Sequence, residues 1–168
     1  MKALITGANG FIGQVLLKKL INNGFKVRIL TRNLQKNKID NCEFFKVDLT
    51  SNTEDLSQVA VGCDFVFNCA GEVIDKKKMY DLHVIGTERL IKGVLESYRI
   101  DKKQKHWIQL SSIGVYGNSQ NHTKGVTINE DFKIKPVGEY EKTKAMSDEI
   151  IISYSKTNNL IYTILRPS

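Results

Sequence analysis

The feature that most constrains the fold of this chain is a short apolar run that leads directly into a glycine-rich turn. Lys2 to Thr6 read as a buried strand, and Gly7, Gly10 and Gly13 follow at three-residue spacing. Glycine permits a sharp turn, close approach of a ligand to the backbone and tight packing of a helix on a strand. The free N–H groups at the start of the next helix would then attract a pyrophosphate. A tight turn without a ligand is the alternative interpretation of this motif by itself.

Apolar segments with strand and helix periodicity alternate along the rest of the chain. Strands are expected at 2–6, 26–31, 44–47, 64–69, 106–110 and 160–165, and helices at 11–23, 53–59, 77–99 and 138–157, with a polar loop at about 117–136. This alternation predicts an α/β fold with a doubly wound parallel sheet of about six strands and helices on both faces. Residues 1–168 are expected to form one domain.

Composition and charge narrow the class of protein. The chain is 41% hydrophobic and 26% charged, as in soluble globular proteins, and it contains no apolar run of membrane-spanning length. Cys42, Cys63 and Cys69 show neither metal-site nor disulfide-framework spacing, so we expect no metal and a cytoplasmic location. The net charge is +7, but the lysine clusters are scattered. We therefore expect solvated loops and no nucleic-acid or membrane partner.

Polar residues and glycines follow the carboxyl ends of the predicted strands, where ligands of such sheets bind. Arg32 follows the second strand, Asp48 the third, Gly71 the fourth and Ser112 the fifth, which together predict a nucleotide cofactor. Arg32 stands where an acid would bind a ribose 2′-hydroxyl, and an arginine can bind a 2′-phosphate, so NADP is expected in preference to NAD. An exposed loop cation is the alternative for Arg32. Asp48 could accept a hydrogen bond from the adenine amino group or could cap a turn.

A tyrosine and a lysine four residues apart share one face of the last predicted helix. The Lys144 ammonium is expected to lower the pKa of Tyr140 from its ordinary value of about 10, which would suit proton transfer. Such pairs are commonplace and are more often structural. Ser112 could donate a hydrogen bond to a substrate oxygen near this pair.

Four motifs occur together and in a fixed order: residues 6–13, 68–71, 111–117 and the pair Tyr140 and Lys144. In this combination the chain resembles the extended short-chain dehydrogenase/reductase family, the NAD-dependent epimerases and dehydratases of nucleotide sugars. The resemblance implies a Rossmann-type fold, catalytic roles for Ser112, Tyr140 and Lys144, and an Arg166 turn near the nicotinamide. The motifs and the strand-end positions together predict a set of cofactor-binding residues: Gly7, Asn9, Gly10, Phe11, Ile12, Gly13, Arg32, Asp48, Leu49, Cys69, Ala70, Gly71, Tyr140 and Lys144.

The sequence departs from the family pattern at three points, and the first is that its second strand lacks the acid expected of the NAD-preferring sugar epimerases. His83 stands where the family usually has asparagine, and we expect it to bond to backbone rather than relay protons. The chain ends at Ser168, whereas family members continue, so the C-terminal substrate lobe is expected to be absent. An exposed sheet edge or patch would then favour a homodimer.

The expected function is that of an NAD(P)-dependent oxidoreductase, epimerase or dehydratase acting on a nucleotide sugar. Hydride and proton transfer would be assisted by the tyrosine and lysine, with low activity in a 168-residue fragment. Two alternatives remain open at this point: an NADP-dependent reductase of a small carbonyl compound, and a non-catalytic NADP-binding sensor module.

Overall fold

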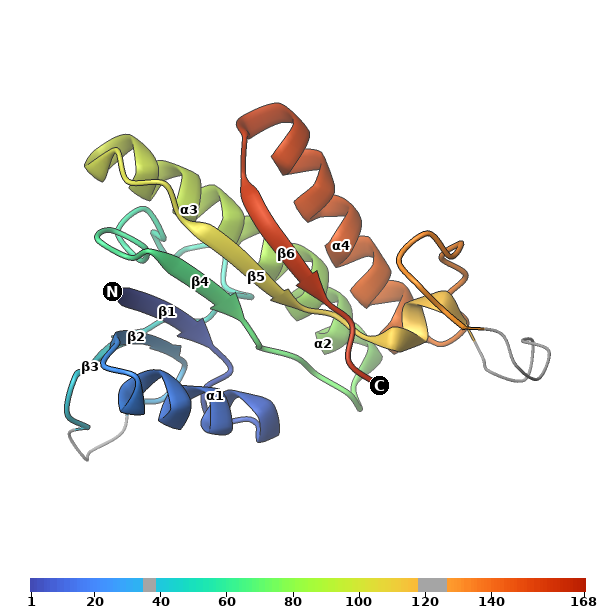
Figure 1. The fold of residues 1–168 in the computed structure, drawn as a ribbon, viewed down its shortest axis with the longest axis horizontal. Helices are drawn as coiled ribbons and strands as arrows, with labels where there is room; N and C mark the ends of the chain where they lie inside the picture. Colours follow the sequence, from blue (N-terminus) through green and yellow to red (C-terminus); the bar gives the residue numbers. More distant parts are fainter. Residues whose placement is uncertain (35–38, 118–126) are drawn as a thin grey trace.

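The computed structural model describes residues 1–34, 39–117 and 127–168, which form one sheet flanked by helices (Figure 1). The strands are β1 (Lys2–Thr6), β2 (Lys26–Thr31), β3 (Cys42–Lys46), β4 (Phe65–Asn68), β5 (His106–Leu110) and β6 (Ile161–Leu165). The helices are α1 (Phe11–Asn22), α2 (Lys76–Tyr80), the π-helix η1 (Asp81–Gly86), α3 (Thr87–Asp101), the 3₁₀ helix η2 (Ile113–Tyr116) and α4 (Glu139–Asn158).

All strands of the sheet run parallel, in the order β3-β2-β1-β4-β5-β6. In the sheet, β2 and then β3 lie on one side of β1, and β4, β5 and β6 follow on the other side. This order confirms the predicted doubly wound fold, and it places the switch point between β1 and β4.

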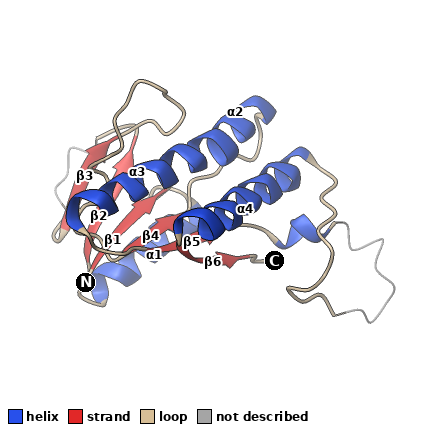
Figure 2. Cartoon of the chain, turned by 90° about the horizontal axis from the view of Figure 1, so that it is seen from above, coloured by secondary structure: helices blue, strands red, loops and turns tan. Residues whose placement is uncertain are grey.

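Helices cover both faces of the sheet, as predicted (Figure 2). The alternation of side chains along β1 shows how: Leu4 packs into the core beneath α3 and α4, whereas Ala3 and Ile5 pack beneath α1. On the α1 side, the strands β4 to β6 keep partly exposed apolar side chains. At the β6 edge, Ile161 and Leu165 are 47% and 49% exposed.

The predicted helix at 53–59 is wrong, because this segment forms turns. The Asp55 carboxylate accepts hydrogen bonds from the backbone N–H and the hydroxyl of Ser57, a local pattern that competes with helix formation. The predicted helix at 77–99 exists but is interrupted by η1. The third strand starts at Cys42 rather than at residue 44. Of the predicted polar loop, residues 118–126 lie outside the described residues.

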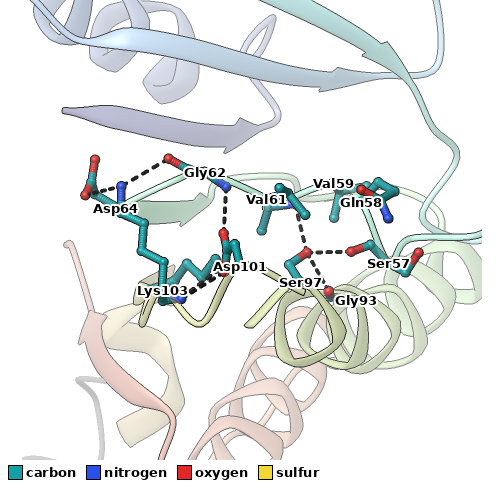
Figure 3. A network of polar contacts seen from close by, with 12 residues as sticks. Ser57, Gln58, Val59, Val61, Gly62, Asp64, Gly93, Ser97, Asp101 and Lys103 are labelled. Carbon is teal, nitrogen blue, oxygen red and sulfur yellow. Dashed lines mark hydrogen bonds and ion pairs between the residues drawn. The ribbon is translucent and has the colours of Figure 1, made fainter. Parts of the chain in front are cut away.

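The segment that leads into β4 is tied to α3 by side chains at the end of the sheet opposite to the strands' carboxyl ends (Figure 3). The Ser97 hydroxyl donates to the Ser57 carbonyl oxygen at 2.7 Å and accepts from the Ala60 N–H at 3.2 Å. Asp101 accepts from the Gly62 N–H at 2.7 Å. These bonds satisfy backbone groups that no regular element would otherwise pair.

We expect Ser97→Ala to lower the free energy of unfolding by about 1–3 kcal/mol, because it leaves the buried Ala60 N–H without an acceptor. Urea unfolding measures this loss as a lower midpoint with an unchanged m-value. Ser153→Ala, at an exposed position of α4, is the control and should stay within about 0.5 kcal/mol. Equal midpoints for the two variants would contradict the structural role of Ser97.

Candidate functional site

A pocket of about 600 Å³ lies at the carboxyl ends of β1 to β4, at the switch point of the sheet. It is lined by residues 6–10, 29–32, 47–50 and 69–72 together with Lys78, Asp81 and Leu82. Such a crevice is the expected ligand site of a doubly wound sheet.

The glycine turn has a shape that other residues could not adopt. Gly7 has a φ of +66°, and a Cβ there would lie 2.7 Å from the Ala70 nitrogen. A Cβ on Gly13 would overlap the Gly7 carbonyl oxygen, so only glycine lets α1 pack against the end of β1. The turn closes through a 2.9 Å hydrogen bond from the Gly10 N–H to the Gly7 carbonyl oxygen.

The N-terminus of α1 is equipped to bind an anion. Its N-cap, Gly10, offers no side-chain acceptor to the first turn, and that turn contains no acidic residue. The N–H groups of Phe11, Ile12 and Gly13 precede the first intrahelical donor, that of Gln14, which bonds the Gly10 carbonyl oxygen. The donors and the helix dipole therefore fit the pyrophosphate of a dinucleotide.

Two buried polar residues that sequence analysis gave no role fix the ends of β1 and β4. The Thr6 hydroxyl donates to Asn68 Oδ1 at 2.7 Å and accepts from the Ala70 N–H at 3.0 Å. The Asn68 amide nitrogen then donates to Thr87 Oγ1 and Gln109 Oε1. These bonds join β1, β4, β5 and α3 beneath the pocket. Their sequence signal is a polar residue at the end of an otherwise apolar strand.

Arg32, Asp48 and Leu49 lie on the pocket wall beyond β2 and β3. Arg32 is exposed, and within the described ranges no ion pair engages it. Asp48 Oδ1 accepts from the backbone N–H and the hydroxyl of Thr50, bonds that hold the pKa of Asp48 below its usual value. Asp48 thus performs the turn-capping role that was one of its two expected roles, at a position that also faces the pocket.

Lys144 projects from α4 toward the ends of β4 and β5. Its side chain is almost fully buried, and Nζ donates to the Leu110 carbonyl oxygen at 2.8 Å. Burial lowers the pKa of Lys144 to about 8 and raises that of the nearby Cys69 thiol to about 11. A Cβ on Gly71 would lie 3.9 Å from Lys144 Nζ, so this lysine reaches the pocket's Gly71 edge.

Tyr140 lies one turn before Lys144 and is half-buried. Its ring packs edge-on against His83, with 5.6 Å between ring centroids, and Lys144 Nζ lies 5.8 Å from the tyrosine centroid. Burial, followed by the charge of Glu141, raises the pKa of Tyr140, whereas a lowered pKa was expected. The expectation fails because loss of hydration on burial dominates at the phenol. Tyr140 therefore carries its proton at neutral pH.

The strand ends of β5 and β6 meet α4 through a buried carboxylate. Asp148 Oδ2 accepts from the Ser111 hydroxyl at 2.8 Å and forms an ion pair with Arg166 at 3.0 Å. Burial raises the pKa of Asp148, partly opposed by Ser111 and Arg166. Sequence analysis missed Asp148, although it lies one turn after Lys144 on the same helix face.

Ser112 begins η2, where its hydroxyl oxygen accepts from the Gly114 N–H at 3.1 Å. The Pro167 carbonyl oxygen accepts from the Ile113 N–H at 3.0 Å, which places the Arg166–Pro167 turn beside Ser112. Among the predicted site residues, Phe11, Ile12, Gly13, Ser112, Tyr140 and Lys144 lie outside the pocket lining itself, and Phe11 is 87% exposed. Within residues 1–34, 39–117 and 127–168, no His, Cys, Asp and Glu side chains group together as metal ligands would.

Comparison with known proteins decides the family. Residues 3–168 match the NAD dependent epimerase/dehydratase family. The chain belongs to this family. The match confirms the resemblance found in the sequence, and it spans the glycine turn, the pocket and the helix that carries Tyr140 and Lys144.

The relatives of this chain are identical to it at about a quarter of the aligned positions. The decarboxylating sterol-4-alpha-carboxylate 3-dehydrogenase of Dictyostelium discoideum is 26% identical over 96% of this chain and 50% of its own length. The UDP-glucose 4-epimerase of Pisum sativum is 29% identical over 89% of this chain and 46% of its own length. The UDP-glucuronic acid 4-epimerase of Bacillus cereus, solved in complex with NAD, has a TM-score of 0.80 at 24% identity, covering 99% of this chain and 55% of its own.

The chain spans about half the length of these relatives. The structural likeness confirms the Rossmann-type fold. In the part of the chain that the structure describes, no helix has the length and apolarity needed to cross a membrane.

Proposed function

We propose that this chain is the cofactor-binding part of an NAD(P)-dependent oxidoreductase, epimerase or dehydratase acting on a nucleotide sugar. The observation that carries the proposal is the meeting, at Gly71, of a glycine-cradled pocket with the side chain of Lys144. Relatives named as UDP-glucose and UDP-glucuronic acid 4-epimerases support the substrate class.

The pocket supplies the groups that a dinucleotide needs. The turn at Gly7, Gly10 and Gly13 and the first N–H groups of α1 would hold the pyrophosphate. Asp48 and Leu49 lie on the wall beyond β3, where they would meet the adenine, and the backbone at Ala70 and Gly71 would line the other half. The bound dinucleotide supplies a centre that accepts and returns a hydride.

The remaining steps belong to side chains of this chain. Tyr140 keeps its proton at neutral pH and would donate it to a substrate oxygen as negative charge develops there. Lys144 is cationic below about pH 8, and it would hold a ribose hydroxyl and stabilise the tyrosinate that remains after the transfer. Ser112 would donate a hydrogen bond from its hydroxyl to the same substrate oxygen. The hydroxyl oxygen of Ser112 already accepts a hydrogen bond from the Gly114 N–H.

We further propose that NADP is preferred to NAD. The last residue of β2 is Thr31, whose hydroxyl bonds the Asn33 carbonyl oxygen, and the following side chain on the pocket wall is the Arg32 guanidinium. An arginine at this position can bind a 2′-phosphate with charge-assisted hydrogen bonds.

Arg32→Ala is expected to weaken NADPH binding about 10- to 100-fold and to leave NADH binding unchanged, because only the 2′-phosphate would contact this side chain. Calorimetric titration of both nucleotides measures the two affinities. Lys156→Ala removes an exposed cation near the C-terminal end of α4 and is the control for net charge. Equal losses for NADPH and NADH in Arg32→Ala would overturn the assignment of Arg32.

The catalytic proposal is tested with the whole protein and a panel of UDP- and dTDP-sugars. Reduced nicotinamide absorbance during turnover, together with sugar products identified by NMR, would support it. Oxidation of NADPH by simple aldehydes and ketones, with no reaction of any nucleotide sugar, would favour the carbonyl reductase instead. Nucleotide binding without hydride transfer to any member of the panel would indicate the sensor module.

A further inference from the structure

His83 is a buried histidine that bridges two parts of the site. It lies in η1, and only 2% of its surface is exposed. Its Nε2 accepts a hydrogen bond from the Glu72 N–H at 2.9 Å, and its Nδ1 lies 2.8 Å from the Thr143 hydroxyl oxygen. One ring therefore connects the pocket-lining loop after β4 with the turn of α4 between Tyr140 and Lys144.

The hydrogen-bond pattern assigns the proton on this ring. The Thr143 hydroxyl donates its proton to the Tyr140 carbonyl oxygen at 3.0 Å, so its oxygen is an acceptor toward His83. Nδ1 must then carry a hydrogen. A backbone N–H can only donate, so the Glu72 N–H requires a bare Nε2. The ring is thus a neutral Nδ1–H tautomer whose proton position is set by Thr143 and the Glu72 N–H together.

Burial and the charge of Lys144 favour the same neutral form of His83. From α4, the Lys144 ammonium and the Tyr140 ring face it, and from the loop after β4 the Glu72 carboxylate does so. Burial first, and then the charge of Lys144, lower the pKa of His83 to about 4, with Glu72 opposing. A charged ring would also have to donate from both nitrogens, which would break the bond from Glu72.

The Glu72 loop is held mainly by local bonds. Glu72 Oε1 accepts from the N–H groups of Val73 and Ile74, whose side chains are 69% and 85% exposed. The bond from the Glu72 N–H to His83 anchors this loop to a buried group, two residues after the bond from the Ala70 N–H to Thr6. Movement of the loop would displace the edge of the pocket at Gly71.

We propose that His83 is a positioning residue that fixes the pocket-lining Gly71–Glu72 edge relative to Tyr140, as a neutral tautomer that Thr143 stabilises together with the Glu72 N–H. The functional meaning of this role rests on the proposed function, because that proposal says what Tyr140 and the pocket edge do. The hydrogen-bonded link through His83 does not depend on the proposed function. Thr143→Val would remove the acceptor for the His83 Nδ1–H. The ring could then also adopt the Nε2–H tautomer, which cannot accept from the Glu72 N–H, so the Glu72 loop would loosen.

The test uses the whole protein with ¹⁵N-labelled histidine and measures three properties: the ring nitrogen signals of His83, hydrogen exchange at the Glu72 amide, and the affinity for NADPH. His83→Gln assigns the ring signals. Thr157→Val is the matched control, because Thr157 also bonds a backbone carbonyl oxygen of α4 but lies at its far end.

In the wild type, we expect a protonated Nδ1 and a bare Nε2 throughout neutral pH. Thr143→Val should increase the share of Nε2–H, speed exchange at Glu72 about tenfold and weaken NADPH binding about tenfold, on the scale of one lost hydrogen bond. Thr143→Ser should restore all three, and Thr157→Val should change none.

A protonated Nε2 in the wild type would overturn the proposal. Unchanged ring signals and unchanged Glu72 exchange in Thr143→Val would overturn it as well. If both change as expected but no variant binds NADPH, the link stands and the proposed function fails.

Discussion

Tyr140→Phe is expected to lower kcat by about 10²- to 10⁴-fold and to leave NADPH affinity within about twofold. The substitution removes only the hydroxyl, which is the group proposed to donate a proton. The ring keeps its edge-on packing against His83, so the fold and the pocket should be unaffected. Turnover by the whole protein gives kcat, and calorimetry gives the NADPH affinity.

Tyr98→Phe provides the matched control, because Tyr98 is an exposed tyrosine near the C-terminal end of α3. It should change neither quantity. A Tyr140→Phe protein with wild-type kcat would remove Tyr140 from the mechanism, even if the cofactor assignment held.

Gly13→Ala should abolish measurable dinucleotide binding, with a loss of at least about 100-fold, and should lower the free energy of unfolding by about 1–3 kcal/mol. The new Cβ would overlap the Gly7 carbonyl oxygen, so α1 must move away from the glycine turn. That movement would displace the N–H groups that are proposed to hold the pyrophosphate. Calorimetry and urea unfolding measure the two losses.

Two neighbouring variants separate binding from folding. A Cβ on Gly10 would lie 3.2 Å from the Gly7 oxygen and would not overlap it, so Gly10→Ala should cost less stability than Gly13→Ala while it narrows the approach to the backbone. Gln14→Ala, at an exposed position of α1, should alter neither property. Wild-type binding by Gly13→Ala would show that close packing of α1 on β1 is not needed for the site.

The sequence predicts the features of this molecule that depend on nearby residues. The strand β1, the glycine turn and α1 follow from the pattern of residues 2–22, and the parallel direction of the strands follows from the alternation of elements. The helix expected at 53–59 is absent because hydrogen bonds from the Ser57 N–H and hydroxyl to the Asp55 carboxylate stabilise a turn there. That competition depends on side-chain geometry rather than on periodicity.

Side-chain partners far apart in the sequence could not be predicted. His83 meets Thr143, and Asp148 meets Arg166, only because the sheet order brings α4 beside η1 and β6 beside β5. The pKa of Tyr140 was predicted in the wrong direction for a related reason. The four-residue spacing predicts a lysine ammonium near Tyr140, but the extent to which the phenol is buried depends on the packed structure.

The central claim is that the glycine turn and the N-terminus of α1 form the dinucleotide site. Hydrogen–deuterium exchange of the whole protein, with and without saturating NADPH, tests it directly. We predict slower exchange in the peptide containing the N–H groups of Phe11, Ile12 and Gly13, together with the segment 69–72. NADPH binding that leaves both segments unprotected, or no binding by a folded protein, would contradict the account.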